Sequence, residues 1–151
     1  MSLEKLINSD IKNAMLAKDK KKLNALRAIK AALLLEKTGK DVSSGEIPES
    51  VELSVLQKLV KQRKEAALLY VEQNRPDLAE EESYQAEVIT AYLPEQMSEE
   101  EIKSAIQAVI EQTGASSMKD MGKVMGMASK SLAGKADNKM ISTIVKDLLG
   151  S

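Results

Sequence analysis

Lysines gather around two glycines between Gly114 and Asp137, and their charge suits a phosphate ligand. Gly122 and Gly126 are four residues apart, so on a helix they share a stripe without side chains. A foreign backbone can approach such a stripe closely, and an ammonium group beside it can bind a phosphate. The candidate contact residues for RNA or a protein partner are Lys119, Gly122, Lys123, Gly126, Lys130, Lys135 and Lys139.

The two glycines can also be explained by packing of another helix of the same chain. Apolar residues recur every three or four positions around them, which predicts a helix with one buried face: Met118, Met121, Met125, Ala128 and Leu132. Each glycine inside a helix costs roughly 1 kcal/mol relative to alanine, so the two oppose the helix by about 2 kcal/mol. Close packing of another helix of this chain, on a strip that Ser129 and Ala133 extend, would offset this cost. The sequence favours this intramolecular contact and leaves an outside partner as the alternative.

Residue types that catalyse are scarce. With no histidine and no cysteine, the usual general base near neutral pH and the thiol nucleophile are both missing. Ser116 and Ser117 lie near Lys119, but Ser117 is expected to cap a helix. The adjacent carboxylates of residues 80–82 point about 100° apart on a helix and cannot converge on one metal ion. Neither Gly-Lys pair of the glycine-bearing segment is followed by Ser or Thr, as a P-loop requires. We expect no catalytic residue, no metal site and no cofactor.

Composition predicts the elements that hold these residues. Of 151 residues, 43% are hydrophobic and only 2% aromatic, so the core consists of Leu, Ile, Val, Ala and Met. Such a core favours helices, and we expect an all-α protein. Apolar spacing and capping signals place helices at about residues 3–18, 19–39, 48–74, 76–93, 98–113, 117–134 and 137–149, with a loop over residues 40–47.

A proline after Leu93 divides these helices into two groups. The residue before a proline is pushed out of the α region, so the fourth helix ends there. Ser98 and Glu101 then have the spacing of a capping box, which starts a new helix. We expect an N-terminal helical domain of about four helices over residues 1–96 and a C-terminal three-helix domain over residues 97–151.

Charge is distributed unevenly along the chain, although the net charge is −1. Residues 1–40 hold ten Lys and Arg against four Asp and Glu, whereas residues 41–96 hold five against twelve. Residues 114–151 hold six against three. We expect pairing within the molecule and solvated helix faces to account for most of this pattern, with a basic patch for nucleic acid as the alternative.

Localisation is inferred from what the sequence lacks. It contains no cysteine and no apolar run long enough to cross a membrane. Its first twenty residues carry charges throughout instead of the apolar core of a signal peptide. We therefore expect a cytoplasmic protein without a membrane partner.

Two stretches of the sequence resemble a known family. The first is KQRKEAALLYVEQNRPDLAEEE (61–82) with YLPEQMSEEEI (92–102), and the second is GASSMKDMGKVMG (114–126) followed by GKAD (134–137). Their order is similar to that of the YqeY family, whose C-terminal part resembles the tail domain of the GatB subunit of tRNA-dependent amidotransferases. The resemblance covers essentially the whole chain. The family-motif positions singled out here are Arg63, Arg75, Asp77, Asp120, Gly134 and Asp137.

The resemblance implies a function as well as a helical fold of two parts. Because the GatB tail domain helps to bind tRNA, it implies a non-catalytic, tRNA-associated accessory protein. A label such as carbon-nitrogen ligase with glutamine as amido-N-donor would describe the amidotransferase, and any such activity here would need partner subunits. The alternative is a protein-protein interaction module that uses the Gly122 and Gly126 face, without RNA, to bind a tRNA-linked protein.

Overall fold

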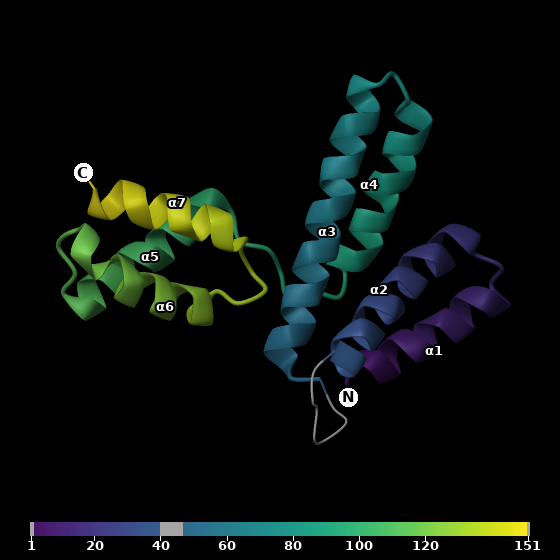
Figure 1. Ribbon diagram of the computed structural model, residues 1–151, viewed down its shortest axis with the longest axis horizontal. Coiled ribbons are helices and arrows are strands. Elements are labelled where there is room, and N and C mark those ends of the chain that lie inside the picture. The colour runs from purple at the N-terminus through teal and green to yellow at the C-terminus, as the bar shows by residue number, and fades with distance from the viewer. Residues whose placement is uncertain (1, 40–46, 151) are drawn as a thin grey trace. The chain divides into compact units, whose positions relative to one another are not determined.

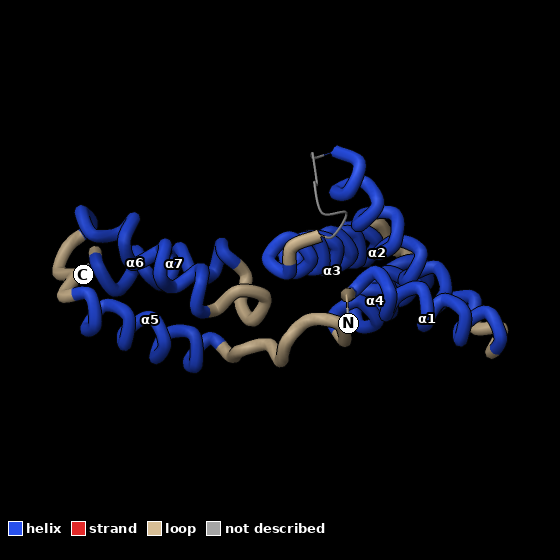
Figure 2. The backbone as a smooth tube through the Cα atoms, turned by 90° about the horizontal axis from the view of Figure 1, so that it is seen from below, coloured by secondary structure: helices blue, strands red, loops and turns tan. Residues whose placement is uncertain are grey.

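The structure, a computed structural model, describes residues 2–39 and 47–150 (Figure 1). Within these residues every regular element is helical and no strand occurs (Figure 2), which confirms the all-α class. The predicted loop over residues 40–47 lies outside the described residues except for Ile47. The helices are α1 (Leu3–Leu16), α2 (Lys20–Gly39), α3 (Glu49–Glu72), α4 (Pro76–Thr90), α5 (Glu99–Thr113), α6 (Met121–Ser131) and α7 (Asn138–Leu149), with the 3₁₀ turn η1 (Met118–Asp120) before α6.

Contacts along the chain divide it into an N-terminal unit that ends at Leu93 and a C-terminal unit that begins at Pro94. The sequence places this boundary three residues later. Each unit has its own hydrophobic core, and the two clusters of buried residues share no member. No helix in the described ranges combines the length and apolarity that crossing a membrane requires.

The N-terminal unit consists of two helical hairpins, α1–α2 and α3–α4 (Figure 1). Lys18 and Asn74, in the turns of the two hairpins, have φ angles of 58° and 57° and so adopt the left-handed conformation that closes a tight turn. Aliphatic side chains at helical spacing fill the core between the hairpins, and burying each contributes about 1.5–3 kcal/mol. These core residues are Ile7, Ala14, Leu26, Ile29, Leu33, Val55, Leu56, Leu59, Val60 and Ile89.

A hydrogen bond joins two distant parts of the N-terminal unit. The Tyr92 hydroxyl, just after α4, donates to the Asp10 carboxylate on α1. The Tyr92 ring is half-buried and packs against the core. Burial and the neighbouring carboxylate both raise the pKa of Tyr92 above its ordinary value, because each disfavours the phenolate.

Replacing this hydroxyl is expected to affect stability in a pH-dependent way. We predict that Tyr92→Phe lowers the free energy of unfolding at neutral pH by about 1 kcal/mol, because it removes a hydrogen bond to a charged group. The raised pKa of Tyr92 means that this stability is present below about pH 10 and is lost as the pH rises through the folded-state pKa. Urea unfolding at neutral and alkaline pH measures it. Tyr84→Phe is the control, and an equal loss in that variant would contradict the assignment.

The C-terminal unit consists of α5, α6 and α7 around a second aliphatic core. The predicted capping box is confirmed at the start of α5, where Ser98 Oγ accepts from the Glu101 N–H at 3.2 Å and Glu101 Oε1 accepts from the Ser98 N–H at 3.1 Å. Gly114, with a φ of 69°, ends this helix in the left-handed conformation. The buried core residues are Ile102, Ile106, Val109, Val124, Ala128, Leu132, Ala136, Ile141, Ile144, Val145 and Leu149.

Two predictions for the start of the glycine-bearing helix are wrong. The Ser117 side chain makes no capping hydrogen bond, and α6 begins only at Met121. Met118, predicted to be buried, is 45% exposed, whereas Val124 is fully buried. The cause is the intervening η1 turn. A 3₁₀ turn has about three residues per turn, so it shifts the phase of the apolar face that the α-helical spacing predicts.

Candidate functional site

The two glycines of α6 face open space. Gly122 and Gly126 are both exposed, and a Cβ atom added at either would meet no heavy atom of the chain within 4 Å. The prediction that another helix of the same chain packs against them is therefore wrong. The reason is that Val124 and Ala128, the buried positions of α6, lie on the opposite side of the helix. No contact at the glycines themselves offsets their cost to the helix.

Lysines flank this open stripe on α6. Lys123 and Lys130 are exposed and seven residues apart, which places them on one face of the helix beside Gly126. No Asp or Glu occurs between the first and last residues of α6. We call this set, Gly122, Lys123, Gly126 and Lys130, the open face of α6.

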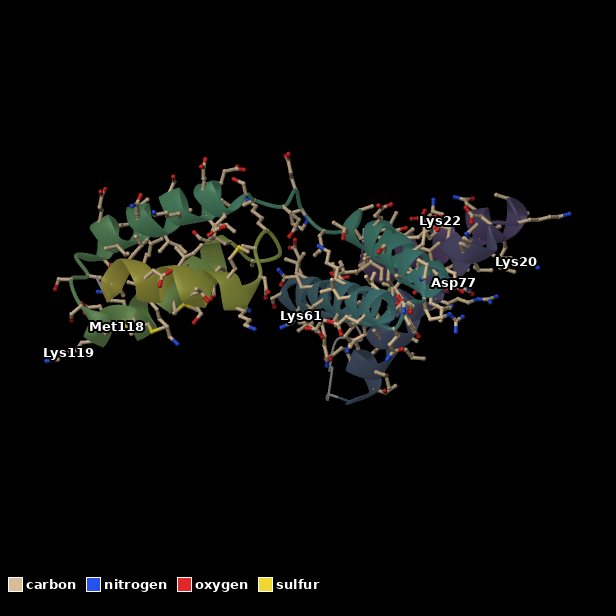
Figure 3. The ribbon with its side chains drawn as sticks, turned by 90° about the horizontal axis from the view of Figure 1, so that it is seen from above. Lys20, Lys22, Lys61, Asp77, Met118 and Lys119 are labelled. Carbon is tan, nitrogen blue, oxygen red and sulfur yellow. The ribbon has the colours of Figure 1, made fainter. Side chains whose placement is uncertain are left out.

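The other three candidate lysines belong to neighbouring segments. Lys119 extends into solvent from η1 beside Met118 (Figure 3). Lys135 lies in the turn after α6, where its backbone carbonyl accepts from the Met97 N–H at 3.0 Å. Lys139 is in the first turn of α7, and its N–H donates to Asp137 Oδ1 at 3.3 Å. All three side chains are exposed, but only Lys123 and Lys130 are held on one helical face.

The acidic residues of the C-terminal unit lie mainly elsewhere. Four glutamates are on α5, at Glu99, Glu100, Glu101 and Glu111, and all are exposed. The pKa of Glu101 is lowered because its carboxylate accepts the backbone and side-chain hydrogen bonds of the capping box. The unit is therefore polarised, with anionic charge on α5 and cationic charge around α6 and the start of α7.

Family-motif residues in the N-terminal unit hold its second hairpin together. Arg63 Nε donates to Gln85 Oε1 at 2.9 Å and lies 3.8 Å from Glu82 Oε2, which ties α3 to α4. Arg75 donates two hydrogen bonds to the Asp77 carboxylate across the start of α4, at 3.2 and 3.1 Å. These bonds lower the pKa of Asp77. Both sets of contacts give these residues a structural role in the hairpin.

Family-motif residues in the C-terminal unit shape its turns. Asp120 Oδ2 accepts from the Ser116 N–H at 3.1 Å, and Asp137 caps α7. Gly134 adopts a φ of 77°, and its carbonyl accepts from Gln96 Nε2 at 2.7 Å. The structure thus gives each motif residue a role in local folding, while the exposed side chains of the open face have none.

The N-terminal unit has two surface hollows, and the polar groups in the larger one serve structural contacts. The hollows measure about 330 and 270 Å³ and adjoin the start of α3. In the larger one Glu4 pairs with Lys37 at 3.5 Å, and Glu52 accepts from the Leu3 N–H at 2.9 Å. These polar groups join α1, α2 and α3. Across residues 2–39 and 47–150, no three carboxylates converge on a point that could hold a metal ion.

Sequence reasoning missed the exposure of three methionines in the C-terminal unit. Met118, Met127 and Met140 are 45%, 37% and 42% exposed. Met127 lies between Lys123 and Lys130 on α6, and Met140 is in the first turn of α7. The exposure of Met127 could have been predicted, because this residue directly follows Gly126 and does not fit the spacing of three or four residues that the buried apolar positions have.

Comparison with known proteins identifies relatives along nearly the whole chain. A family model described as "Yqey-like protein" matches residues 4–149. Proteins called "Altered inheritance of mitochondria protein 41, mitochondrial" are similar. The one from Pyrenophora tritici-repentis is 30% identical over 153 residues, covering 96% of this chain and 80% of the relative. The one from Clavispora lusitaniae is 34% identical over 99 residues, covering 64% and 56%. The one from Vanderwaltozyma polyspora is 27% identical and covers 92% and 77%.

These names correct one prediction. The expected cytoplasmic location is wrong, because all three relatives are named as mitochondrial proteins. The physical reason is that cysteine content and hydropathy report on redox chemistry and membrane spans, not on the compartment in which a helical domain works. The family prediction, in contrast, is confirmed by the match over residues 4–149. The chain belongs to the YqeY family.

Proposed function

We propose that this protein is a non-catalytic accessory factor that binds tRNA through the open face of α6. The observation that carries the proposal is the pair of exposed glycines flanked by Lys123 and Lys130, on a helix without acidic residues. Glycines that cost helix stability and contact nothing in the chain are expected where a ligand approaches the backbone. Lysines on the same face supply the charge that a phosphate backbone requires.

The chemistry of the chain supports backbone contact over base recognition. Unpaired bases are usually held on aromatic side chains, and this protein has only three tyrosines and no Phe or Trp. Tyr92 is occupied in the core of the N-terminal unit. Binding would therefore depend on phosphates and on RNA shape. The resemblance of the C-terminal unit to the GatB tail domain is the reason for naming tRNA within this class.

A gel-shift titration with bulk tRNA at low salt tests the proposal. We predict a shift whose log-log salt dependence has a slope of roughly −3 to −4, as expected for about four phosphate contacts. Lys123→Glu with Lys130→Glu should weaken binding at least about tenfold, because each replacement turns an attraction into a repulsion. The control is Lys58→Glu with Lys103→Glu, which makes the same change in net charge at exposed sites on α3 and α5. No shift at low salt, or equal weakening in both variants, would reject the proposal.

The exposed methionines favour a second candidate, a protein-interaction module on the surface of the C-terminal unit that includes Met127 of α6. Met118, Met127 and Met140 offer flexible apolar contacts that a partner helix can use and that RNA phosphates cannot. Pull-down before and after ribonuclease treatment separates the two functions. A partner that survives the nuclease and is lost in Met127→Gln would establish protein contact. The names of the relatives lead us to infer that either function operates in a mitochondrial setting.

A further inference from the structure

The half of the α3–α4 hairpin that is nearer its turn carries large apolar side chains exposed to solvent. Beyond Val60 no residue of α3 belongs to the core cluster. Leu68, Leu69 and Val71 are exposed by 67%, 56% and 60%. The seam between the two helices is instead filled by small and polar residues: Arg63, Ala66, Ala67, Ala79, Glu82, Gln85 and Ala86. A helix pair that faces water usually buries its large apolar side chains and exposes its polar ones, and here these positions are exchanged.

Two stripes of exposed residues lie on the same side of this hairpin. In each stripe every member follows by one position a residue that faces the other helix, for example Lys64 after Arg63, Glu87 after Ala86 and Lys61 after Val60 of the core. Both helices are right-handed but run antiparallel, so their residues turn in opposite senses when the hairpin is viewed along one direction. The positions that follow the inward-facing residues therefore point to the same side of the hairpin on both helices. We call this side the free face: Lys61, Lys64, Leu68 and Val71 of α3 with Glu80, Ser83 and Glu87 of α4.

Helix α2 covers the opposite side of the hairpin. Val55, Leu59 and Val88 each precede a core residue, and all three pack into the core of the N-terminal unit. Because α2 meets both α3 and α4 there, α1 and α2 leave the free face uncovered (Figure 1). Leu69, which precedes Tyr70, belongs to the covered side but lies beyond the core.

The free face is complementary to itself in charge. Its α3 stripe is basic, with Lys61 (Figure 3) and Lys64, and its α4 stripe is acidic, with Glu80 and Glu87. The structure shows no ion pair for any of these four exposed residues among those it describes. The contact of Arg63 with Gln85 sets the register of the hairpin, so Lys61 lies level with Glu87.

We propose that a second copy of this chain docks on the free face, with α3 of each copy across α4 of the other. A twofold axis parallel to the helices produces this arrangement. It places Lys61 level with Glu87 of the other copy, with Lys64 one turn further along, and it brings Leu68 and Val71 against α4 of that copy at the level of Glu80 and Asp77. The same contact thus pairs Lys61 with Glu87 twice and removes Leu68 and Val71 from water.

The size of the face indicates a reversible dimer. From Lys61 to Val71, α3 spans about 15 Å, and two packed helices are about 20 Å wide. Each copy would bury roughly 300 Å², which is in the range of weak, transient interfaces. Sedimentation of the full chain from about 1 to about 500 µM is therefore expected to show a monomer-dimer equilibrium.

Matched variants locate the interface. Leu68→Glu should weaken the dimer at least about tenfold, because it introduces a charge into an apolar contact. Leu69→Glu, on the other side of the same helix, should not. Circular dichroism confirms that both variants are folded. A wild-type chain that remains monomeric throughout, or equal effects of the two substitutions, would overturn the proposal.

Charge exchange tests the pairing of the two copies. Lys61→Glu and Glu87→Lys should each weaken self-association, since each makes like charges meet. A mixture of the two single variants should associate again, because each opposite pair is restored between chains. A mixture that stays as weak as its components would overturn the arrangement. The dimer lies in the N-terminal unit, so its failure would leave the proposal for α6 unaffected.

Discussion

Replacing Ile106 with alanine is expected to remove most of the stability of the C-terminal unit. Ile106 lies in the middle of α5, is fully buried and belongs to the core that joins α5, α6 and α7. Truncating such a side chain removes apolar burial and leaves a cavity, which together cost about 3–4 kcal/mol. A unit of this size is stable by only about 5 kcal/mol. The remaining margin is therefore small.

Hydrogen exchange measured by mass spectrometry shows where the loss occurs. Amides of α5, α6 and α7 should lose protection in Ile106→Ala, whereas those of α1 to α4 keep theirs because their core shares no residue with this one. Ile106→Val, which removes one methyl group, should cost only about 1 kcal/mol. Equal loss of protection in both units would show that they unfold as one.

Replacing both glycines of α6 with alanine is expected to stabilise the protein. Gly122→Ala with Gly126→Ala should raise the free energy of unfolding of the C-terminal unit by between about 1 and 2 kcal/mol. The added methyl groups meet nothing within 4 Å, and alanine restricts the unfolded backbone more than glycine does. Thermal unfolding should shift upward by about 4–8 °C for each kcal/mol.

Gly134→Ala is the control, and it should have the opposite sign. Gly134 has a φ of 77°, where a side chain is strained by roughly 1–2 kcal/mol. A loss of stability in the α6 double variant would mean that something packs against these glycines. Stabilisation together with weaker tRNA binding would separate folding from function at the open face. Stabilisation with unchanged binding would contradict the proposed role of the glycines.

Much of the helical framework could be predicted from local sequence. The Ser98 and Glu101 capping box and the start of α4 at Pro76 were found correctly because their determinants lie within one helical turn. The end of α4 was placed at Leu93, three residues too late, since the helix ends at Thr90. A proline marks the last position to which the preceding helix can extend, but the helix can end earlier.

The candidate site was only partly predictable. Lysine and glycine types indicate the region, but of the five candidate lysines only Lys123 and Lys130 lie on one helical face in the structure. The predicted packing at the glycines is wrong because the buried positions of α6 lie on its opposite side. The predicted burial of Met118 is wrong because this residue belongs to η1 and not to α6. The exposure of Leu68 and Val71 is also invisible to periodicity. It arises because α3 extends beyond the part of the hairpin that α2 covers.

Sequence alone therefore determined the helical class, the family motifs and the chemistry the chain lacks. These follow from residue type and from interactions within a few positions, which do not need the rest of the fold. Tertiary structure decided which faces of those helices are covered. Gly122 and Gly126, or Leu68 and Val71, become candidate contact surfaces only because no other segment of the described chain packs against them. Burial is a property of distant neighbours, and local pattern does not contain it.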